Sequence, residues 1–354
     1  MPHDPVQRRT LWIRQQRAQV NPLAMVRTQL KTILWAVPPV VLLLLAFVAL
    51  LLRLFVQDRM PGLLAYVYYA ASPATLAGAV LAAGLWWLIP RHFKAALPTL
   101  VMALVASSFV LATMFRFNPP RSPSSEPVRI LYWNVAHGVR GWPNIAAVIR
   151  RYDADLVGLV EAGEDTAAMT TVWARHLPEY QAAAYDTGIT VLSRRPLRVV
   201  TASSRETWSR YVHATIDVDQ RPLHFVVFDI LHTIGLSRDV AFDPLYEALE
   251  PLNGHAVVIG GDFNTPADSV HLERLRRTYD SAFETAGQGY AATWPVPLPL
   301  LTIDQAWASS AVRLLNCRHG WSTLSDHRPV ILEVSLEPPP ASAPTTNETL
   351  ADQS

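Results

Sequence analysis

The sequence predicts one layered α/β or α+β domain that follows three membrane-spanning helices. Three long runs without a charged residue lie in the first third of the 354-residue chain. Beyond them, short runs of β-branched and apolar residues alternate with amphipathic stretches, a pattern typical of strands and helices packed in layers. A stretch rich in proline and serine separates these two parts of the chain.

Three apolar runs define the predicted spans, which together occupy residues 32–116. The first covers residues 33–52, the second about 63–89 and the third about 95–115. Each reaches about 20 residues, the length that a hydrocarbon layer of roughly 30 Å requires of a helix. A single run of this kind could be a buried helix of a soluble protein, but three in succession argue against that alternative.

Positive charges beside the spans predict how the chain is oriented. Segment 1–31 is basic, with Arg8, Arg9, Arg14, Arg17, Arg27 and Lys31, and the loop after the second span carries Arg91 and Lys94. By the positive-inside rule, both segments are expected in the cytoplasm. The first connecting loop is mixed, because Arg53 and Arg59 accompany Asp58. Three crossings then predict a multi-pass protein of the inner (plasma) membrane whose soluble domain is extracytoplasmic.

Two polar, proline-containing stretches bound the soluble domain, which is expected to cover residues 128–337. Residues 117–127 (FNPPRSPSSEP) suit a short tether, and residues 338–354 form a tail too polar to pack, predicted to be disordered. The chain has one cysteine, Cys317, so no intrachain disulfide can form. The domain is therefore expected to depend on its apolar core for stability.

Short strands and a few helices alternate along the domain. Helices are expected at residues 144–152, 166–176 and 240–252, where the sequence is amphipathic. Strands are expected at residues 128–135, 155–161, 188–193, 213–218, 223–230, 255–263, 303–309 and 328–336. No internal repeat is present in the sequence.

Polar side chains recur where these predicted strands end. They are Asn134, Glu161, His232, Asp262, Asn264 and the pair Asp326 and His327. If the strand ends converge on one rim, they bring acids, amides and two imidazoles into a single cleft. In the stretch GGDFNTP, the glycines allow close approach of the backbone, and a period of two is expected to turn Asp262 and Asn264 to the same face.

This set of side chains favours a hard divalent cation. Carboxylate and carboxamide oxygens are the ligands that Mg²⁺ or Mn²⁺ prefers. Zinc is the competing cation, but no closely spaced His–His or Cys–Cys pair has the usual ligand spacing. A hard cation, histidines and amide donors together suit an anionic transition state centred on phosphorus. Phosphoester hydrolysis is therefore the predicted reaction.

Seven segments, in order, resemble the endonuclease/exonuclease/phosphatase superfamily, also called deoxyribonuclease-I-like. The segments are ILYWNV, LVGLVE, GITVLSRRP, VVFDILHT, VVIGGDFNTP, TIDQAW and SDHRPV. The resemblance covers essentially the whole soluble domain, and the pair GGDFNTP and SDHRPV gives it most of its specificity. It implies a two-sheet β-sandwich flanked by helices, with the site at one end of the sheets.

The resemblance implies a metal site formed by Asn134, Glu161 and Asp326. Glu161 matches the principal Mg²⁺ ligand, and Asp326 matches a second ligand. Ala136 stands where some nucleases of the superfamily carry an acid, so one ligand of those nucleases is missing here. Taken alone, Asn134 is more simply a residue that forms a turn at a strand end.

The resemblance also implies five catalytic residues. His232 matches a histidine that contacts the scissile phosphate, although its surroundings depart from the usual pattern, and alone it is more simply a satisfied histidine. Asp262 would orient or deprotonate the attacking water, and Asn264 would donate to a phosphate oxygen. Asp304 matches the carboxylate that orients His327. Either Asp262 or His327 could be the general base, and the sequence leaves this open.

Charge and location bear on the substrate. Residues 128–337 contain 18 arginines, no lysine and 24 acids, whereas a protein that binds duplex DNA irrespective of sequence usually presents a basic face. This balance and the membrane anchor favour a phospholipid headgroup or another extracytoplasmic phosphoester. We hypothesise that the apolar stretch 294–301 lies near the cleft and touches lipid or an apolar substrate. A proline-rich loop packed on the sandwich is an equal alternative.

The predicted function is that of a membrane-anchored phosphoesterase that depends on a divalent metal. We take it as a phosphodiesterase, although the motifs do not separate diesters from monoesters. A metal-dependent nuclease is the first alternative, and a membrane scaffold whose site has decayed is the second. The expected partners are the bilayer and a phosphoester, whether a lipid headgroup, a small molecule or a nucleic acid. No protein partner can be inferred.

Overall fold

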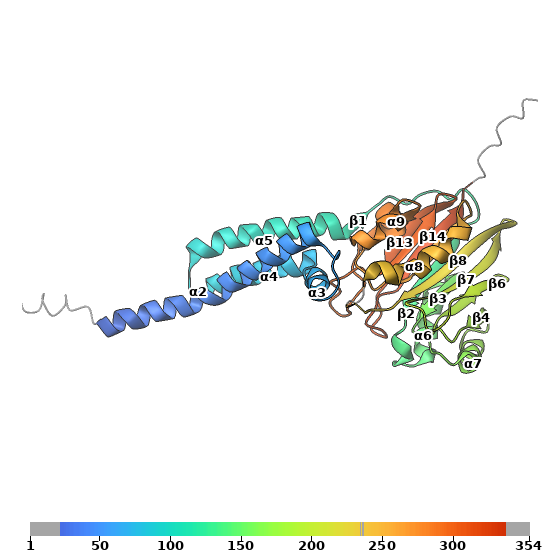
Figure 1. Ribbon diagram of the computed structural model, residues 1–354, viewed down its shortest axis with the longest axis horizontal. Coiled ribbons are helices and arrows are strands. Elements are labelled where there is room, and N and C mark those ends of the chain that lie inside the picture. Colours follow the sequence, from blue (N-terminus) through green and yellow to red (C-terminus); the bar gives the residue numbers. More distant parts are fainter. Residues whose placement is uncertain (1–21, 234, 236, 338–354) are drawn as a thin grey trace, which may run out of the picture. The chain divides into compact units, whose positions relative to one another are not determined.

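The computed structural model describes residues 22–233, 235 and 237–337, and these fall into two compact units. The first unit joins the described residues up to Leu51 to Pro73–Phe109. The second joins Leu52–Ser72 to the described residues from Val110 onward (Figure 1). The segment Leu52–Ser72 therefore folds with the soluble domain. The predicted tail, and the basic N-terminal segment up to residue 21, lie outside the described residues.

Two helices in the described chain are long and apolar enough to cross a membrane. One covers Thr32–Val56, with 25 residues, and the other covers Phe93–Met114, with 22 residues. The first consists of most of α2 (Pro22–Leu51) and the π-helical turn η1 (Leu52–Val56), and the second is α5 (Phe93–Met114).

The predicted second span is not one continuous helix. It breaks into α3 (Leu63–Ala70) and α4 (Pro73–Leu88), which are bent by 69° relative to each other. Pro73 begins α4, since proline lacks the amide hydrogen that an uninterrupted helix would use there. The expectation of three spans holds only if this bent pair counts as one span, so it stays a prediction.

The soluble domain is built on two mixed sheets, as the resemblance implies. The first sheet has the strand order β1 (Phe115–Phe117), β11 (Gly287–Tyr290), β13 (Val312–His319), β14 (Val330–Leu336), β2 (Val128–Asn134), β3 (Leu156–Val160), β5 (Thr190–Ser193), β4 (Gln181–Ala184). The second has the order β10 (Tyr279–Ser281), β12 (Asp304–Ser309), β9 (Val257–Asp262), β8 (Arg221–Ile230), β7 (Ser209–Val218), β6 (Arg198–Ala202). Each sheet contains antiparallel and parallel pairs; β2 pairs with β3, and β8 with β9, in parallel.

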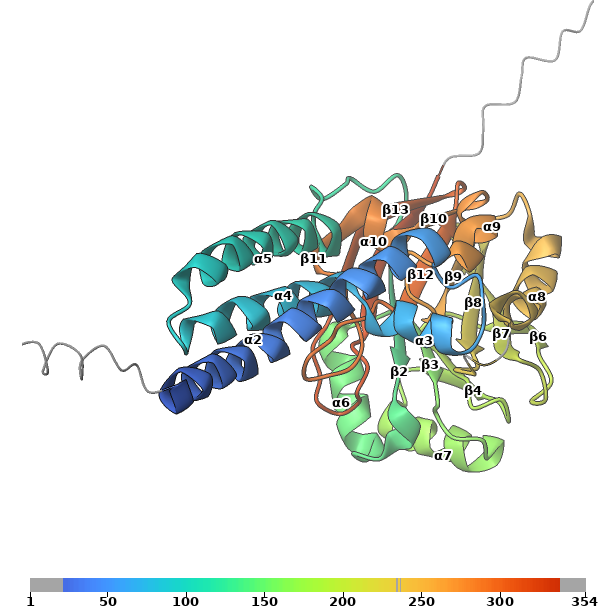
Figure 2. The same ribbon diagram turned by 60° about the vertical axis from the view of Figure 1, so that its left-hand side comes forward.

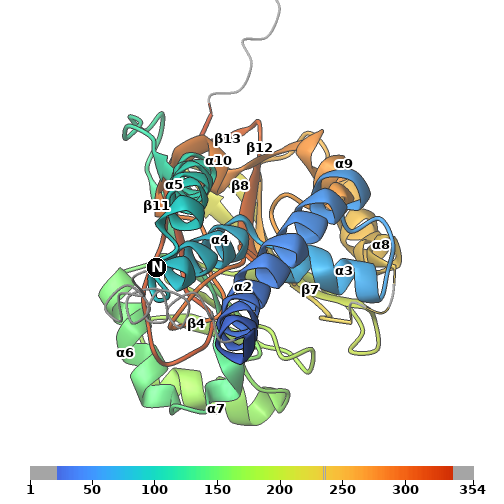
Figure 3. The same cartoon turned by 90° about the vertical axis from the view of Figure 1, so that its left-hand side faces the viewer.

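Helices cover the outer faces of the two sheets. Helices α6 (Trp142–Tyr152) and α7 (Thr166–His176) pack on the first sheet, and α8 (Arg238–Leu249) packs on the second. Figure 3 shows α6 and α7 on one side of the domain and α8 and α9 on the other. The short elements η2 (Ala136–Gly138), η3 (Glu250–Leu252), η4 (Val270–Leu272), α9 (Glu273–Arg276) and α10 (Ala282–Ala286) complete the described domain.

Alternation along the strands separates the apolar cores. In β2, Ile130 and Tyr132 enter the core between the sheets, while Leu131 and Trp133 pack beneath α6 and α7. Strand β8 alternates in the same way between the central core and the core under α8. A residue's position in this period of two therefore decides whether it faces the other sheet.

The predicted tether is held against the first sheet. It starts within β1, whose residues pair with β11, and residues 118–127 contain no helix or strand. The amide of Asn118 donates to the Gly287 carbonyl at 3.2 Å. At the other end, the Ser124 hydroxyl donates to the Leu336 carbonyl at 3.0 Å. The connection is short, as predicted, but it is anchored to the domain.

Candidate active site

A row of four charged side chains crosses the second sheet near the ends of its central strands. Arg210 of β7, Asp229 of β8, Asp262 of β9 and Asp304 of β12 are successive partners in the strand register. The alternate residues further along these strands enter the core between the sheets, so all four lie on the face turned to the first sheet. The three carboxylates are buried. Negative charge is thus concentrated at one end of the sandwich.

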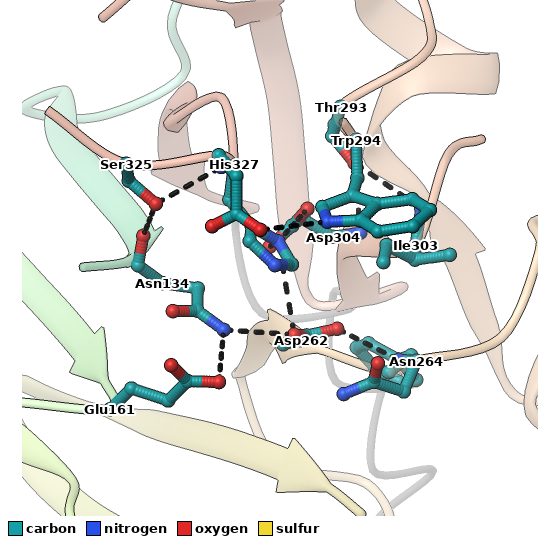
Figure 4. Close-up of polar contacts among 12 residues, drawn as sticks. Asn134, Glu161, Asp262, Asn264, Thr293, Trp294, Ile303, Asp304, Ser325 and His327 are labelled. Carbon is teal, nitrogen blue, oxygen red and sulfur yellow. Dashed lines mark hydrogen bonds and ion pairs between the residues drawn. The ribbon is translucent and has the colours of Figure 1, made fainter. Parts of the chain in front are cut away.

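Asn134 and Glu161 reach this row from the ends of β2 and β3. The amide nitrogen of buried Asn134 donates to Glu161 Oε1 and to Asp262 Oδ2, both at 3.0 Å (Figure 4). One amide therefore joins the two sheets, and the two acceptor oxygens are at most twice this distance apart. Glu161 has a φ of 52°, so the backbone turns directly after β3. His137 Nε2 lies 3.3 Å from Glu161 Oε2.

Gly260 and Gly261, just before Asp262, are needed because atoms of neighbouring strands lie close to the backbone at both positions. A Cβ on Gly260 would lie 2.4 Å from the ring of Tyr132. Gly261 has a φ of 137°, and a Cβ there would lie 1.9 Å from the Phe228 carbonyl oxygen. Only glycine lets β9 lie this close to both neighbours.

A turn, and not the strand's alternation, brings Asn264 beside Asp262. The expected period of two is wrong here, because β9 ends at Asp262 and Asn264 has a φ of 45°. The amide of Asn264 donates to Asp262 Oδ1 at 2.8 Å, and its side chain donates to the Ile230 carbonyl at 3.0 Å. Asn264 thus fixes the second oxygen of Asp262 through its backbone.

His327 is held by a carboxylate, as the resemblance implies. Its Nδ1 atom lies 2.9 and 3.0 Å from the two oxygens of Asp304 (Figure 4). Ser325 accepts from the His327 amide at 3.0 Å and donates to the Asn134 carbonyl at 2.8 Å. The Thr293 hydroxyl accepts from the Asp304 amide at 3.1 Å. Each member of the pair is therefore fixed by its own backbone contact.

The clustered acids shift the pKa values in the site. Burial alone would lower the pKa of His327, but the carboxylates of Asp304 and Asp262 outweigh burial and raise it. Burial, reinforced by the Asp304 charge, raises the pKa of Asp262. Burial and the charge of Glu161 raise the pKa of Asp229 to about 6. The acids repel one another, and the imidazole between two of them is stabilised as a cation.

The residues of the site fit a divalent cation, but the cluster of Asp262, Asp304 and His327 is not a suitable set of ligands. Ligand atoms of Asp262, Asp304 and His327 lie within 4.8 Å of one another. The Nδ1 atom of His327, however, is already hydrogen-bonded to Asp304. A protonated imidazole has no free lone pair with which to bind a metal ion. Glu161, whose side chain is a third exposed, is better placed as a ligand. The surplus of buried negative charge beside it is what a divalent cation would neutralise.

Asp326 lies on the exposed rim and contacts the apolar stretch 294–301. Its Oδ2 atom accepts from Trp294 Nε1 at 3.0 Å, and its carbonyl accepts from the Val296 amide at 2.7 Å. The Trp294 ring lies 6.5 Å from the His327 ring, between centroids. The stretch thus lies beside the site, as hypothesised. Its contact with lipid, and metal binding by Asp326, stay predictions.

His232 is not brought together with the other predicted residues. It is exposed, two residues beyond the end of β8, and makes none of the contacts that join the others within the described chain. Residues 234 and 236, close to it in sequence, lie outside the described residues. Its contact with a phosphate stays a prediction.

The sequence reasoning missed four residues of the site: His137, Arg210, Asp229 and Trp294 as a partner of Asp326. Asp229 could have been found, because it is an acid at an inward-facing position of the apolar run VVFDI. Arg210 gave no such signal, since its place beside Asp229 depends on the pairing of β7 with β8. His137 stands beyond its strand, where alternation predicts nothing.

The fold and the site define a class of hydrolase that acts on phosphoesters: two mixed sheets with buried acids, an amide and a carboxylate-held imidazole at one end. Residues 131–327 match the family described as the endonuclease/exonuclease/phosphatase family, and the chain belongs to this family. Members of the family are hydrolases of phosphoesters. The resemblance drawn from the seven segments is thereby confirmed.

Solved structures agree with the fold. The endonuclease/exonuclease/phosphatase from Bacteroides vulgatus superposes with a TM-score of 0.51 at 17% identity, covering 60% of this chain and 100% of that chain. A family protein from Bacteroides thetaiotaomicron gives a TM-score of 0.50 at 16% identity, covering 61% and 100%. In sequence, protein YbhP of Escherichia coli (strain K12) is 34% identical over 89 residues, 24% of this chain. That match spans about a third of the relative, 35% of its length.

Proposed function

We propose that the chain is a membrane-anchored phosphodiesterase that uses a divalent metal and hydrolyses its substrate by in-line attack of water on the extracytoplasmic side. One observation carries the proposal. Asn134 binds Glu161 and Asp262, while Asp304 holds His327 with its Nδ1 atom 3.8 Å from Asp262. The Asp262 carboxylate, the cationic imidazole of His327 and the metal-binding acid Glu161 therefore lie around a single site, where a phosphate could bind.

The geometry suggests how the chain's own residues divide the work. An imidazole between two carboxylates suits the role of a cation that stabilises charge on phosphate oxygens, which leaves Asp262 to accept the proton of the attacking water. As the bond from the water oxygen to phosphorus forms, the bond from phosphorus to the leaving oxygen breaks, and the leaving oxygen departs with that electron pair and takes a proton from solvent. Asn134 and the Asn264 amide hold Asp262 in place for this transfer.

Glu161 and Asn134, with Asp326 on the rim, would hold the metal. When bound, Mg²⁺ or Mn²⁺ would polarise the phosphoryl group and neutralise charge on its oxygens. The donors are carboxylate and amide oxygens, the set that these hard cations prefer. Ala136 offers no ligand, which favours a site with few protein ligands.

An apolar face on the second unit supports a bilayer as partner. In the segment Leu52–Ser72, large apolar side chains are more than half exposed, including Leu54, Phe55, Met60 and Leu63. A soluble surface rarely leaves such a patch in water, and the first part of this segment, Leu52–Val56, is the end of a helix long enough to span a membrane. We propose that lipid covers this face, and that the substrate is a phosphoester presented at the bilayer, such as a phospholipid headgroup.

The chain segments that make up the second unit also support the proposed topology. Leu52–Ser72 and the domain from Val110 fold together, so both belong on one side of the membrane. The chain between them must then cross an even number of times. Since α5 is long enough to span, α4 is the element that would supply the return crossing. A reporter fused to the C-terminus tests the side, because activity confined to the cytosol would contradict an extracytoplasmic domain.

Hydrolysis of bis-p-nitrophenyl phosphate by the full-length protein in detergent tests the activity. We expect turnover with Mg²⁺ or Mn²⁺ that is lost with a chelator and in Asp262→Ala, but kept in Asp280→Ala, which removes an exposed acid of β10. Phospholipids, sphingomyelin, nucleic acids and inositol phosphates would then separate a lipid-directed enzyme from a nuclease. Silence toward all of them with either metal would favour the decayed scaffold.

A further inference from the structure

The segment Leu52–Ser72 is tied to the domain by a buried arginine. Arg53 forms an ion pair with Asp268, donates to the Tyr68 carbonyl at 2.7 Å and lies 4.3 Å above the Tyr68 ring. The Tyr68 hydroxyl donates to the Asp268 carbonyl at 2.9 Å. Arg53 is 9% exposed, so this charge is not the free cation that a membrane-flanking loop would usually present. Figure 2 shows α3 beside the second sheet.

A buried acid makes the second attachment. Asp58 is 2% exposed and accepts from the Ser269 hydroxyl at 2.5 Å and from the Val270 amide at 3.3 Å. Its carbonyl lies 3.0 Å from His271 Nε2, whose other ring nitrogen lies 2.6 Å from Asp239. A carboxylate buried in this way depends on its donors, because leaving it unpaired would be costly. The mixed charge of this loop is therefore explained by its contacts.

The third attachment reaches the active site. The Tyr69 hydroxyl donates to the carbonyl of Asn264 at 3.3 Å. Arg238 of α8 donates to the same carbonyl at 3.3 Å and to the Phe263 carbonyl at 2.8 Å. Asn264 has a left-handed φ of 45°, a conformation that persists only where surrounding contacts hold it. Arg238 thus holds the Phe263–Asn264 peptide, whose N–H group fixes Asp262. Tyr69 and Arg238 both hold the following peptide through the Asn264 carbonyl.

We propose that the segment Leu52–Ser72 supports the catalytic turn from outside the site through Asp58 and Tyr69, with Tyr69 as a positioning residue that acts through Asn264. This inference rests on the proposed function of the same site. The segment joins two membrane helices in sequence, so any change in them that moves the segment also moves the catalytic turn. Catalysis would then depend on a part of the chain about 60 residues before the family match begins.

Removal of one hydroxyl tests the positioning role. In the full-length protein, Tyr69→Phe keeps the ring but removes the donor to Asn264. We expect kcat to fall about fivefold, the equivalent of one neutral hydrogen bond, with KM within about twofold. Tyr66→Phe, on the exposed side of the same helix, is the matched control and should keep the wild-type kcat. An active enzyme whose Tyr69→Phe variant keeps the wild-type kcat overturns the positioning role.

Hydrogen exchange tests the attachment without any substrate. We expect residues 264–271 to be protected in the full-length protein, and Asp58→Ala to raise their exchange and to lower kcat at least about tenfold. Arg59→Ala, at the exposed neighbour, should change neither. Unchanged exchange in Asp58→Ala overturns the attachment. If the wild-type protein hydrolyses no phosphoester, the proposed function fails, whereas the exchange result still decides whether the segment is attached.

Discussion

Two buried histidines of this domain have opposite surroundings. His327 and His319 are 6% and 8% exposed. His327 is bonded through Nδ1 to both oxygens of Asp304. His319 stacks on Phe283, with ring centroids 4.5 Å apart, and no carboxylate contacts it within the described chain. Burial lowers the pKa of both, and near His319 the Arg328 charge lowers it further, to about 3, whereas at His327 the acids reverse the direction.

The difference shows that burial alone does not decide what a histidine does. Both imidazoles lie near the first sheet's last hairpin, since β13 ends at His319 and β14 begins three residues after His327. What separates them is an acid delivered by a strand of the other sheet, Asp304 of β12. A histidine becomes a cation suited to phosphate chemistry where the second sheet supplies a carboxylate, and it becomes a packed aromatic ring where it does not.

The largest expected effect comes from exchanging the two imidazoles for amides. His327→Gln should lower kcat by about 10²- to 10⁴-fold, because the positive charge beside the phosphate is lost. His319→Gln should leave kcat within about twofold, because that ring faces Phe283 and not the site. Steady-state rates with a soluble diester measure both. Equal losses in the two variants would contradict a catalytic role for His327 that His319 does not share.

Removing the acid should make His327 behave more like His319. Asp304→Asn is expected to lower kcat about 100-fold, since the imidazole loses the carboxylate that orients and charges it. The kcat of the double variant Asp304→Asn, His327→Gln should be no lower than that of His327→Gln alone, because the two residues act as one unit. Asp280→Asn, which changes an exposed acid, is the control. Fully additive losses would show that Asp304 acts independently of His327.

Much of the fold follows from the sequence because alternation and apolar runs are local signals. The helix at 166–176 is found with the bounds of α7, and the strand at 128–135 is one residue longer than β2. The strands β4, β6 and β13 and the short β1, β10 and β11 were not predicted. Their sequences lack a long apolar run, and pairing with a neighbouring strand makes them strands. The break before Pro73 was also missed, because hydropathy ignores a bend within an apolar run.

The site could be predicted only where its residues stand in motifs. Asn134, Glu161, Asp262, Asp304 and His327 end strands or belong to recognisable stretches, and the structure joins them through hydrogen bonds. Arg210 and Asp229 enter the site through strand register, and Tyr69 reaches it from nearly 200 residues away. Register and distant docking depend on the whole fold, which no local pattern contains.

The stability of the domain in acid should depend on His319. Its pKa is about 3 in the folded protein and about 6.5 when unfolded. Between these values the unfolded chain binds a proton that the folded chain does not, so the free energy of unfolding falls as the pH falls. The slope for one such group is up to about 1.4 kcal/mol per pH unit. Denaturant unfolding between pH 6.5 and 4 should therefore have a flatter pH dependence in His319→Leu than in wild type, whereas a slope as steep as the wild-type one would contradict the assignment.

The smallest expected effect comes from replacing the aromatic neighbours of the two imidazoles. Trp294, beside His327, should affect substrate binding, whereas Phe283, beside His319, should affect only stability. Trp294→Leu is expected to raise KM by about two- to tenfold with kcat within about twofold, because the half-buried indole lies at the rim beside His327, where a substrate would contact it. Phe283→Leu should leave KM unchanged and lower the unfolding midpoint, since that ring packs on His319 and on the core between the sheets. In Trp294→Leu, KM should increase more for a lipid-like diester than for a small soluble diester. If KM is unchanged for both substrates, the stretch 294–301 packs on the sandwich without forming part of the substrate site.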